Sequence, residues 1–309
     1  MWFNNLLVYQ YEVAEDFDLN LLLAPEILKP CPPHARFIYG WLPAFRDELV
    51  QEIAGALLFC LGKEERILPR GVINRLLAEK VQMMESQQGR KIKRAEKAQL
   101  AEDLEFELLP KSFCVQKRLP AFLDTKMKRL MVSTSSSNQA SQLTALLRKS
   151  IPNLHLEPLS FNQDLAIRFA TWLSKPHLVP AHFQLAPDCL LFSLDNEKKR
   201  VSCKGYELPS DEILTLISQG LAAAEISLIW NERIQFTLTH ELSFKRLKSL
   251  DYLIDEFNEI GELEEEYQRL DAALVLVSGE LRQLVDDLLF GLNQPSPVAE
   301  ETAQEEVLM

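Results

Sequence analysis

The chain of 309 residues is 47% hydrophobic and 25% charged, and 33 Lys and Arg against 45 Asp and Glu give it a net charge of −12. This composition is that of an ordinary folded protein and excludes wholesale disorder, and no apolar run reaches the ~18 residues of a membrane span. Five scattered cysteines without a C-x-x-C pair favour reduced thiols in the cytoplasm rather than a disulfide framework or a zinc site.

The charged residues are sorted by position along the chain. Residues 63–149 contain 18 basic and 10 acidic side chains, whereas residues 250–309 contain 2 basic and 16 acidic ones. An acidic protein that gathers its cations in one stretch is a candidate for binding a polyanion with one surface while the others keep it soluble. The charge distribution therefore indicates a polyanionic partner for the basic stretch.

The first third of the chain is predicted to join mixed α and β structure to a helical arm. Short apolar runs at 6–9 and 56–61 suit buried strands, and prolines mark a loop between them. From residue 70 to residue 108 apolar side chains recur at helical spacing, and Gly89 divides this predicted helix into two pieces. The expected domains are an N-terminal α+β part at 1–69 and a helical basic arm at 70–118.

A loose internal repetition follows. A strand, a basic segment, a second strand and a helix are predicted at 121–149, 190–219 and 234–259. In the second copy, Pro209-Ser210-Asp211-Glu212 is typical of the start of a helix. Hairpin–helix units are common, so chance similarity explains the pattern as well as a true repeat does.

The C-terminal region is predicted to add one strand and one helix before an acidic tail. The run Ala272-Ala273-Leu274-Val275-Leu276-Val277 is typical of a buried strand, and residues 280–292 of a helix. After Asn293 the chain has several glutamates and no apolar pattern, which predicts a disordered tail. The expected domains are therefore an α+β part at 119–292 and a disordered acidic tail at 293–309.

The sequence contains no recognisable catalytic motif. The histidines form no metal-ligand pattern, because His177 and His182 are five residues apart and do not share a helical face. None of the 10 glycines falls in a G-x-G-x-x-G or Walker arrangement, and Ser135-Ser136-Ser137 has no His or Asp near it in sequence. We therefore expect a protein that is not an enzyme and that needs neither a metal ion nor a cofactor.

The strongest candidate for a binding site is the basic run at 90–97. If this run is helical, Arg90, Arg94 and Lys97 share a face. Like charges at this spacing destabilise a helix by roughly 0.2–0.5 kcal/mol per pair, unless a bound anion neutralises them. An exposed helix that tolerates the repulsion is the alternative. The residues predicted to contact the phosphates of a polyanion are Arg90, Lys91, Lys93, Arg94, Lys97, Lys117, Arg118, Lys126, Lys128 and Arg129.

Two aromatic residues, Phe113 and Phe122, lie among these cations. Three roles are open to each ring: packing in a core, stacking on a base, or sealing a protein interface. Packing in a core is the role we expect unless other evidence favours another. Neutralisation of phosphates by several Lys and Arg side chains releases counterions and gives affinity without sequence preference.

Blocks of sequence between residue 2 and about residue 292 carry a more specific signal. They include Trp2-Phe3-Asn4-Asn5-Leu6-Leu7-Val8-Tyr9, Gly40-Trp41-Leu42-Pro43, Lys63-Glu64-Glu65-Arg66-Ile67-Leu68-Pro69, Leu108-Leu109-Pro110-Lys111-Ser112-Phe113 and Val277-Ser278-Gly279-Glu280-Leu281. In this order the blocks resemble the RdgC family, the recombination-associated DNA-binding proteins of bacteria. The resemblance covers nearly the whole chain and is weakest at 160–205.

The resemblance implies an α+β fold: an elongated, curved subunit of several small sheet-plus-helix units, pairing into a ring-shaped homodimer around duplex DNA. It also implies a cytoplasmic, nucleoid-associated protein that binds double-stranded DNA without sequence specificity and limits access of the RecA recombinase. By position, Phe113 follows Leu-Leu-Pro-Lys and would lie at a ring-closing dimer contact. Lys204 would contact DNA, because it lies where the family has a basic pair followed by Gln. Here Gly205 and Tyr206 follow Lys204, so the second contact differs.

Three functions compete at this point. The leading hypothesis is non-specific duplex binding by a homodimer that turns its cations, including those recurring at 198–200 and 245–248, inward and its carboxylates outward. The second is an interaction protein whose basic surface docks an acidic protein partner, such as RecA or the acidic tail of a neighbouring subunit. The third is a nuclease, which predicts metal-dependent turnover.

Overall fold

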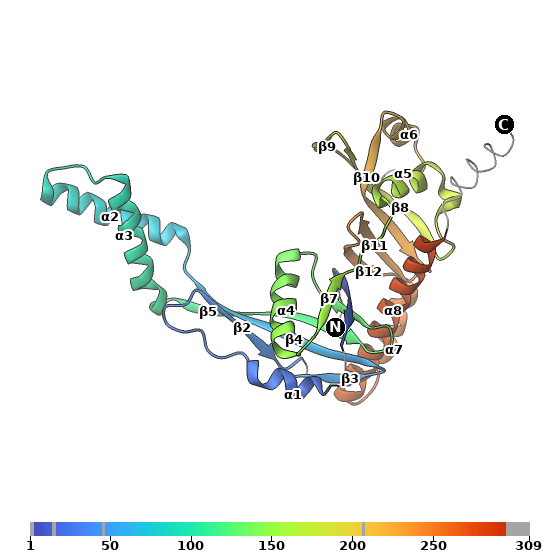
Figure 1. The fold of residues 1–309 in the computed structure, drawn as a ribbon, viewed down its shortest axis with the longest axis horizontal. Helices are drawn as coiled ribbons and strands as arrows, with labels where there is room; N and C mark the ends of the chain where they lie inside the picture. The colour runs from blue at the N-terminus through green and yellow to red at the C-terminus, as the bar shows by residue number, and fades with distance from the viewer. Residues whose placement is uncertain (1–2, 14–16, 45–46, 206–207, 295–309) are drawn as a thin grey trace.

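The computed structural model describes residues 3–13, 17–44, 47–205 and 208–294. Within these ranges the chain forms eight α-helices and two antiparallel sheets, one of seven strands and one of five. Figure 1 shows the first sheet in the middle of an elongated, bent molecule, with a helical hairpin projecting from one end and the second sheet at the other. The predicted mixture of α and β structure is confirmed, and the predicted acidic tail falls, from residue 295 on, outside the described residues.

The first sheet is built from the N-terminal half of the chain. Its strands are β1 (Leu7–Glu12), β2 (Phe37–Leu42), β3 (Gln51–Ile53), β4 (Ala56–Ile67), β5 (Phe113–Asp124), β6 (Arg129–Val132) and β7 (His155–Pro158). They pair in the order β2-β4-β5-β6-β1-β7, with β3 on β4. The predicted strands at 6–9 and 56–61 correspond to β1 and β4, and β4 is long because it pairs with β5 from Ala56 to Ile67.

Both faces of the first sheet are covered. On one face, Trp41, Phe59 and Leu123 pack in a core with α1 (Leu19–Leu23) and α4 (Ser137–Ser150). On the other, Leu58 and Phe122 belong to a larger core that includes the C-terminal helix α8 (Glu266–Asn293). Strands that bury both faces read as continuous apolar runs, which is the pattern of residues 56–61. Phe122 is thus a core residue, as the default interpretation had it.

The helical arm consists of α2 (Arg70–Gln88) and α3 (Arg94–Leu108). The predicted break at Gly89 is confirmed, because Gly89 ends α2 in a left-handed conformation with a φ of 64°. Glycine adopts this conformation without the steric cost that other residues incur. The arm projects from the end of the β4–β5 ribbon, far from the second sheet (Figure 1).

Arg66 of β4 links the root of the arm to the loop before β2. The Arg66 guanidinium donates to the carbonyls of Cys31 and Pro32 at 3.0 and 3.1 Å, on the loop before β2. On the arm side it donates to the carbonyls of Leu109 at 3.2 Å and Ser112 at 3.3 Å. Hydrogen bonds from a charged donor are stronger than neutral ones. Arg66 thus holds the arm in place together with two contacts of α3: the ion pair of Arg36 with Glu105 and the stacking of His34 on Phe106.

The second sheet is built from β8 (Phe183–Ser193), β9 (Asn196–Cys203), β10 (Leu221–Trp230), β11 (Ile234–Thr239) and β12 (Phe244–Ser249). The strand order is β12-β11-β10-β8-β9, so that β9 is an edge strand. Its helices are α5 (Leu165–Ser174), α6 (Asp211–Ser218) and α7 (Asp251–Gly261). Ser210 caps α6, since its hydroxyl accepts from the Ile213 amide.

The predicted hairpin–helix units have the expected order of elements. The first is β5, β6 and α4 in the first sheet, and the other two, β8-β9-α6 and β11-β12-α7, belong to the second sheet. Although the order is the same, the three units are therefore not placed in one continuous sheet.

The strand predicted at 272–277 is wrong, because these residues lie in the middle of α8. A short apolar run suits either a strand or a buried helix. The neighbouring residues favour the helix: Leu274, Val277, Leu281, Val285 and Leu288 are all at most 5% exposed and recur at intervals of three and four. The predicted helix at 280–292 is the second half of the same element.

Helix α8 joins the two sheets by ion pairs on two sides. Towards the first sheet, Arg282 pairs with Asp124 and Asp286 with Arg129. Towards the second sheet, Glu280 and the α7 residue Glu256 each pair with Arg233 at 2.8 Å. Hydrogen bonds to these two carboxylates, Glu256 first, raise the pKa of Arg233. The helix thereby fixes the position of one sheet relative to the other.

Candidate nucleic-acid interface

The basic run at 90–97 lies at the tip of the arm, where α2 turns into α3. The prediction that it forms one helical face is wrong, because residues 90–93 are the connection between the helices and only Arg94 and Lys97 lie on α3. Gly89 ends α2, and the buried Ile92 holds the connection in place. The Ile92 amide donates to the Glu85 carboxylate at 2.9 Å. The cations are thus presented by a tight turn rather than by a straight helix.

One of the five predicted cations at the tip is already paired. Both terminal nitrogens of the Arg90 guanidinium contact the Glu96 carboxylate, at 2.7 and 2.9 Å. The same carboxylate accepts from the Lys93 backbone amide at 2.9 Å. Hydrogen bonds from Arg90 and then from this amide lower the pKa of Glu96 to about 2. Arg90 therefore shapes the turn and is less available to an external anion.

The other four cations of the run are free to bind an external anion. The side chains of Lys91, Lys93, Arg94 and Lys97 are exposed, and no carboxylate in the described ranges lies within ion-pair distance of them. Four exposed positive charges within seven residues of chain create a local positive potential on an acidic protein. We call these four residues the arm-tip cluster.

The predicted cations on β5 contact the protein itself. Lys117 pairs with Glu65 at 2.9 Å, and Lys63 pairs with the same carboxylate at 3.1 Å. Hydrogen bonds from Lys117 and then Lys63 lower the pKa of Glu65. Arg118 donates to the carbonyls of Pro43 and Ala44. A phosphate at either position has to compete with these partners.

The β5–β6 turn separates its three predicted cations into two classes. Lys126 and Lys128 are exposed, and the Lys128 ammonium lies 5.7 Å from the centre of the Tyr11 ring. Arg129 is only 8% exposed and pairs with Asp286 on α8. Arg129 therefore stabilises the contact between the first sheet and α8, and we leave it out of the proposed binding set.

Phe113 lies at the root of the arm and is 85% exposed, which is the largest exposed fraction among the large hydrophobic side chains described. It pairs with Ile67 across β4 and β5. Val115 and Phe37 lie on the same face, since Glu65 is the register partner of both. Ile67, Phe37 and Val115 are 47%, 47% and 39% exposed. The sequence prediction named only Phe113; the alternation of Phe113 and Val115 along β5 could have indicated the rest.

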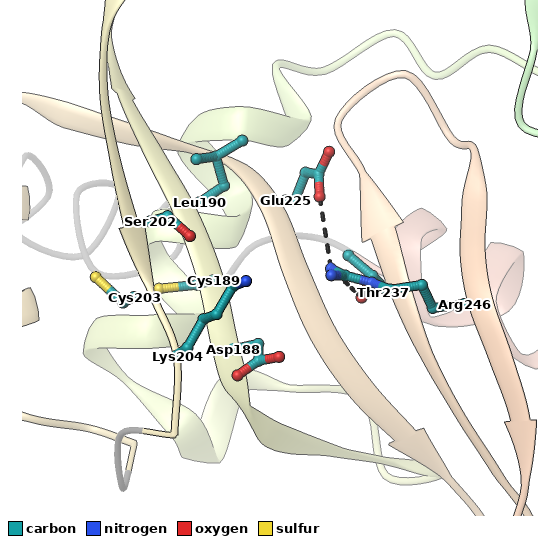
Figure 2. A pocket seen from close by; sticks show the side chains of 9 residues that line it. All are labelled: Asp188, Cys189, Leu190, Ser202, Cys203, Lys204, Glu225, Thr237 and Arg246. Atoms are coloured by element: carbon teal, nitrogen blue, oxygen red, sulfur yellow. Dashed lines mark hydrogen bonds and ion pairs between the residues drawn. The ribbon is translucent and has the colours of Figure 1, made fainter.

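Lys204 lies just after β9, beside a pocket of about 200 Å³ on the second sheet (Figure 2). The lining includes Lys204, Asp188, Glu225, Thr237 and Arg246. Arg246 donates to the Thr237 hydroxyl at 2.9 Å and lies 3.8 Å from the Glu225 carboxylate. Lys245 pairs with the same carboxylate at 2.9 Å. Arg246 thus lines the same pocket as Lys204, and the cations at 245–248 that we expected to face DNA belong to strand β12.

The candidate residues form three separate groups rather than one patch: the arm-tip cluster, the β5–β6 turn, and the pocket on the second sheet. Figure 1 shows the arm and β9 at opposite ends of the molecule, with the first sheet between them. Among the described side chains, no group of three or more His, Cys, Asp or Glu is arranged to hold a metal ion. None of the described helices is both long enough and apolar enough to cross a membrane.

Comparison with known proteins identifies the family. A family model described as "Putative exonuclease, RdgC" matches residues 1–294. The recombination-associated protein RdgC of Pseudoalteromonas translucida is 34% identical over 307 residues, which cover 97% of this chain and 100% of the relative. Proteins of the same name from Proteus mirabilis and Salmonella typhimurium are 35% and 34% identical, each over 94% of this chain and over 97% and 98% of the relative. On this similarity, which runs through both sheets and the arm, the chain belongs to the RdgC family of recombination-associated proteins.

Proposed function

We propose that this protein binds double-stranded DNA without sequence preference, as a ring-shaped homodimer that encircles the duplex and limits access of the RecA recombinase. It would then act in the cytoplasm, on the nucleoid. The observation that carries the proposal is the arm-tip cluster, whose four exposed cations have no carboxylate partner among the described residues. The recombination-associated names of the relatives support the same role.

The separation of the basic groups supports encirclement. A duplex carries negative charge all along its length, so cations at several places around it can be neutralised by phosphates at the same time. The arm tip and the second sheet lie at the two ends of a bent subunit (Figure 1). Two such subunits that close into a ring, with Phe113 at one of the contacts, would surround a duplex with both groups.

The salt dependence of binding tests the proposal most directly. Affinity for unrelated duplexes is expected to be equal, and log K is expected to fall by about 0.9 per log unit of salt for each phosphate neutralised. Fluorescence anisotropy with two duplexes of different sequence, measured between 50 and 200 mM salt, gives both quantities. Binding that does not change over this range of salt would refute the phosphate-contact proposal.

Encirclement has a topological signature. Protein bound to a sealed circular duplex is expected to survive a rise in salt that releases it from a linear duplex of equal length, because a closed ring can slide off free ends only. Cutting the circle after binding should release the protein. Equal release from both forms would contradict a ring while leaving simple DNA binding possible. Labelled linear duplex incubated with Mg²⁺ or Mn²⁺ should stay full-length, and shortening would favour a nuclease instead.

The proposed dimer contact at Phe113 can be tested separately. Burial of a largely exposed phenylalanine at an interface makes it a candidate hot spot, where truncation costs roughly 1–4 kcal/mol. Phe113→Ser is therefore expected to raise the dimer dissociation constant by roughly ten- to a thousandfold, measured by sedimentation equilibrium. Phe290→Ser on α8 is the matched control, since Phe290 is 68% exposed and lies away from the patch of Phe113. If both variants dissociate equally, the contact does not depend on Phe113.

A further inference from the structure

Two cysteines of the second sheet lie directly opposite each other. Cys189 on β8 is the register partner of Cys203 on β9, and each is a free thiol with 6% of its surface exposed. Directly opposed residues of an antiparallel pair have Cα atoms about 4.5–5.5 Å apart. A disulfide requires about 4.4–6.8 Å between these atoms. The backbone therefore already has the spacing of a disulfide.

The same two cysteines line the pocket beside Lys204. Figure 2 shows both cysteines on neighbouring strands, with their sulfur atoms turned away from Glu225 and Arg246. The cysteine side chains belong to the buried core on the other face of the sheet, whereas the neighbouring residues Leu190 and Ser202 face the pocket. A small oxidant therefore reaches the sulfur atoms when the edge strand β9 frays. Burial, and then the neighbouring Cys203 thiol, raise the pKa of Cys189. The higher pKa lowers the fraction of Cys189 thiolate, the reactive form, at neutral pH.

The other three cysteines differ in their surroundings. Cys60 is buried in the first sheet and lies 3.6 Å from the Leu61 carbonyl. Cys31 lies in the loop before β2, where its thiol contacts the Ala35 carbonyl at 3.3 Å. Cys114 is exposed and pairs across the ribbon with Arg66. Among the cross-strand pairs of both sheets, only Cys189 and Cys203 are two cysteines.

We propose that Cys189 and Cys203 are a redox modification site that forms a reversible disulfide when the folded protein meets a peroxide. One of the two sulfur atoms is oxidised first and takes one oxygen from hydrogen peroxide, which gives a sulfenic acid and one water. The other cysteine loses its proton and attacks that sulfur as a thiolate, which forms the S–S bond and releases hydroxide; the hydroxide and the lost proton make the second water. Two thiols and one peroxide thus become one disulfide and two waters, and a dithiol reductant reverses the step.

The disulfide would tie an edge strand to the sheet. Strand β9 pairs only with β8 among the described strands, and it carries the basic residues Lys198 and Lys199. Lys204 follows Cys203 directly in the sequence. Cross-linking therefore limits fraying of β9 and the movement of the backbone that carries Lys204. This thiol chemistry does not depend on the proposed binding of DNA.

Peptide mapping of the full-length protein tests the proposal. The native protein is treated with hydrogen peroxide, alkylated after denaturation and digested with trypsin, which separates Cys189 from Cys203 by cleaving after Lys198, Lys199 and Arg200. We expect a linked pair of peptides and a loss of two of the five free thiols, both reversed by dithiothreitol. The urea midpoint of the oxidised protein should rise, because a cross-link restricts the unfolded chain.

Two variants sharpen the result. Cys203→Ser should abolish the linked peptides, and Cys60→Ser, which removes a buried cysteine of the first sheet, should leave them unchanged. If Cys203→Ser fails to fold, mapping of the unmodified chain still decides the matter. Oxidation that links other cysteines instead, or that reaches only the exposed Cys114 while Cys189 and Cys203 remain thiols, would overturn the proposal.

Discussion

Replacing Lys91, Lys93, Arg94 and Lys97 together by alanine is expected to weaken binding to every duplex by roughly 10²–10³-fold near 0.1 M salt. If each residue neutralises one phosphate, the salt slope should fall by up to about 3.6, which is four times 0.9. The fold of the arm should be retained, because the hydrogen bonds that shape its tip come from Arg90 and from backbone amides to Glu96 and Glu85. Anisotropy titrations at several salt concentrations measure both effects.

A control variant distinguishes the effect of losing the arm-tip contacts from the effect of lowering the positive charge of the whole protein. Arg75, Lys111 and Lys149 pair with Glu79, Glu107 and Glu26 and are distributed over α2, the arm root and α4. Replacing these three cations by alanine should reduce affinity much less per charge than the arm-tip variant does. Equal losses per charge would mean that the overall charge of the protein, rather than the arm tip, determines binding. Arg90→Ala alone should have a small direct effect, since Glu96 already pairs with Arg90.

Asp124→Ala is expected to lower the free energy of unfolding by about 3–5 kcal/mol, because it leaves Arg282 without its partner in a largely buried site. Asp124 is fully buried, and the side chain of Arg282 is 18% exposed. One carboxylate oxygen of Asp124 accepts from the amides of Lys126 at 3.0 Å and Met127 at 3.1 Å, while the other pairs with Arg282. The residue thus closes the β5–β6 turn and binds it to α8. Urea denaturation followed by circular dichroism measures the loss.

Three further variants separate these roles. Asp124→Asn should be less destabilising than Asp124→Ala, since an amide oxygen can still accept from the turn. Combining Asp124→Asn with Arg282→Met should recover part of the loss, because the unpaired charge is then removed. Asp286→Asn, whose partner is Arg129 and whose carboxylate is 29% exposed, should cost less than Asp124→Ala. If the double variant is as unstable as the sum of its parts, the buried charge is not the cause.

Most of the elements could be predicted from the sequence, because their signals are local. Helical spacing and Gly89 indicated the two helices of the arm, and the polar residues at 209–212 indicated the start of α6. The exception is residues 272–277. Six consecutive apolar residues have no period within themselves, and only the apolar positions on both sides show that they belong to one helix.

The candidate site was less predictable, because whether a cation is free depends on residues far away in the sequence. Arg129 pairs with a carboxylate 157 residues later, and Lys117 with one 52 residues earlier. The sequence shows that these residues are basic, but not which of them already have partners. Likewise Phe113 is identifiable from its motif, whereas the patch it forms with Phe37 depends on strand register.

The single helix shared by both sheets affects the order in which the chain can fold. At 28 residues, α8 is about 42 Å long, and it is also the last helix of the described chain to leave the ribosome. Before α8 is synthesised, the side chains of Phe3 and of Leu58 and Phe122 in the first sheet are not covered by it. The apolar face of the second sheet that α8 covers is also open to solvent at that stage. A nascent chain that stalls before residue 266 would therefore expose two apolar surfaces at once, one on each sheet. Chaperone binding during synthesis should be concentrated in that interval and should end when α8 docks.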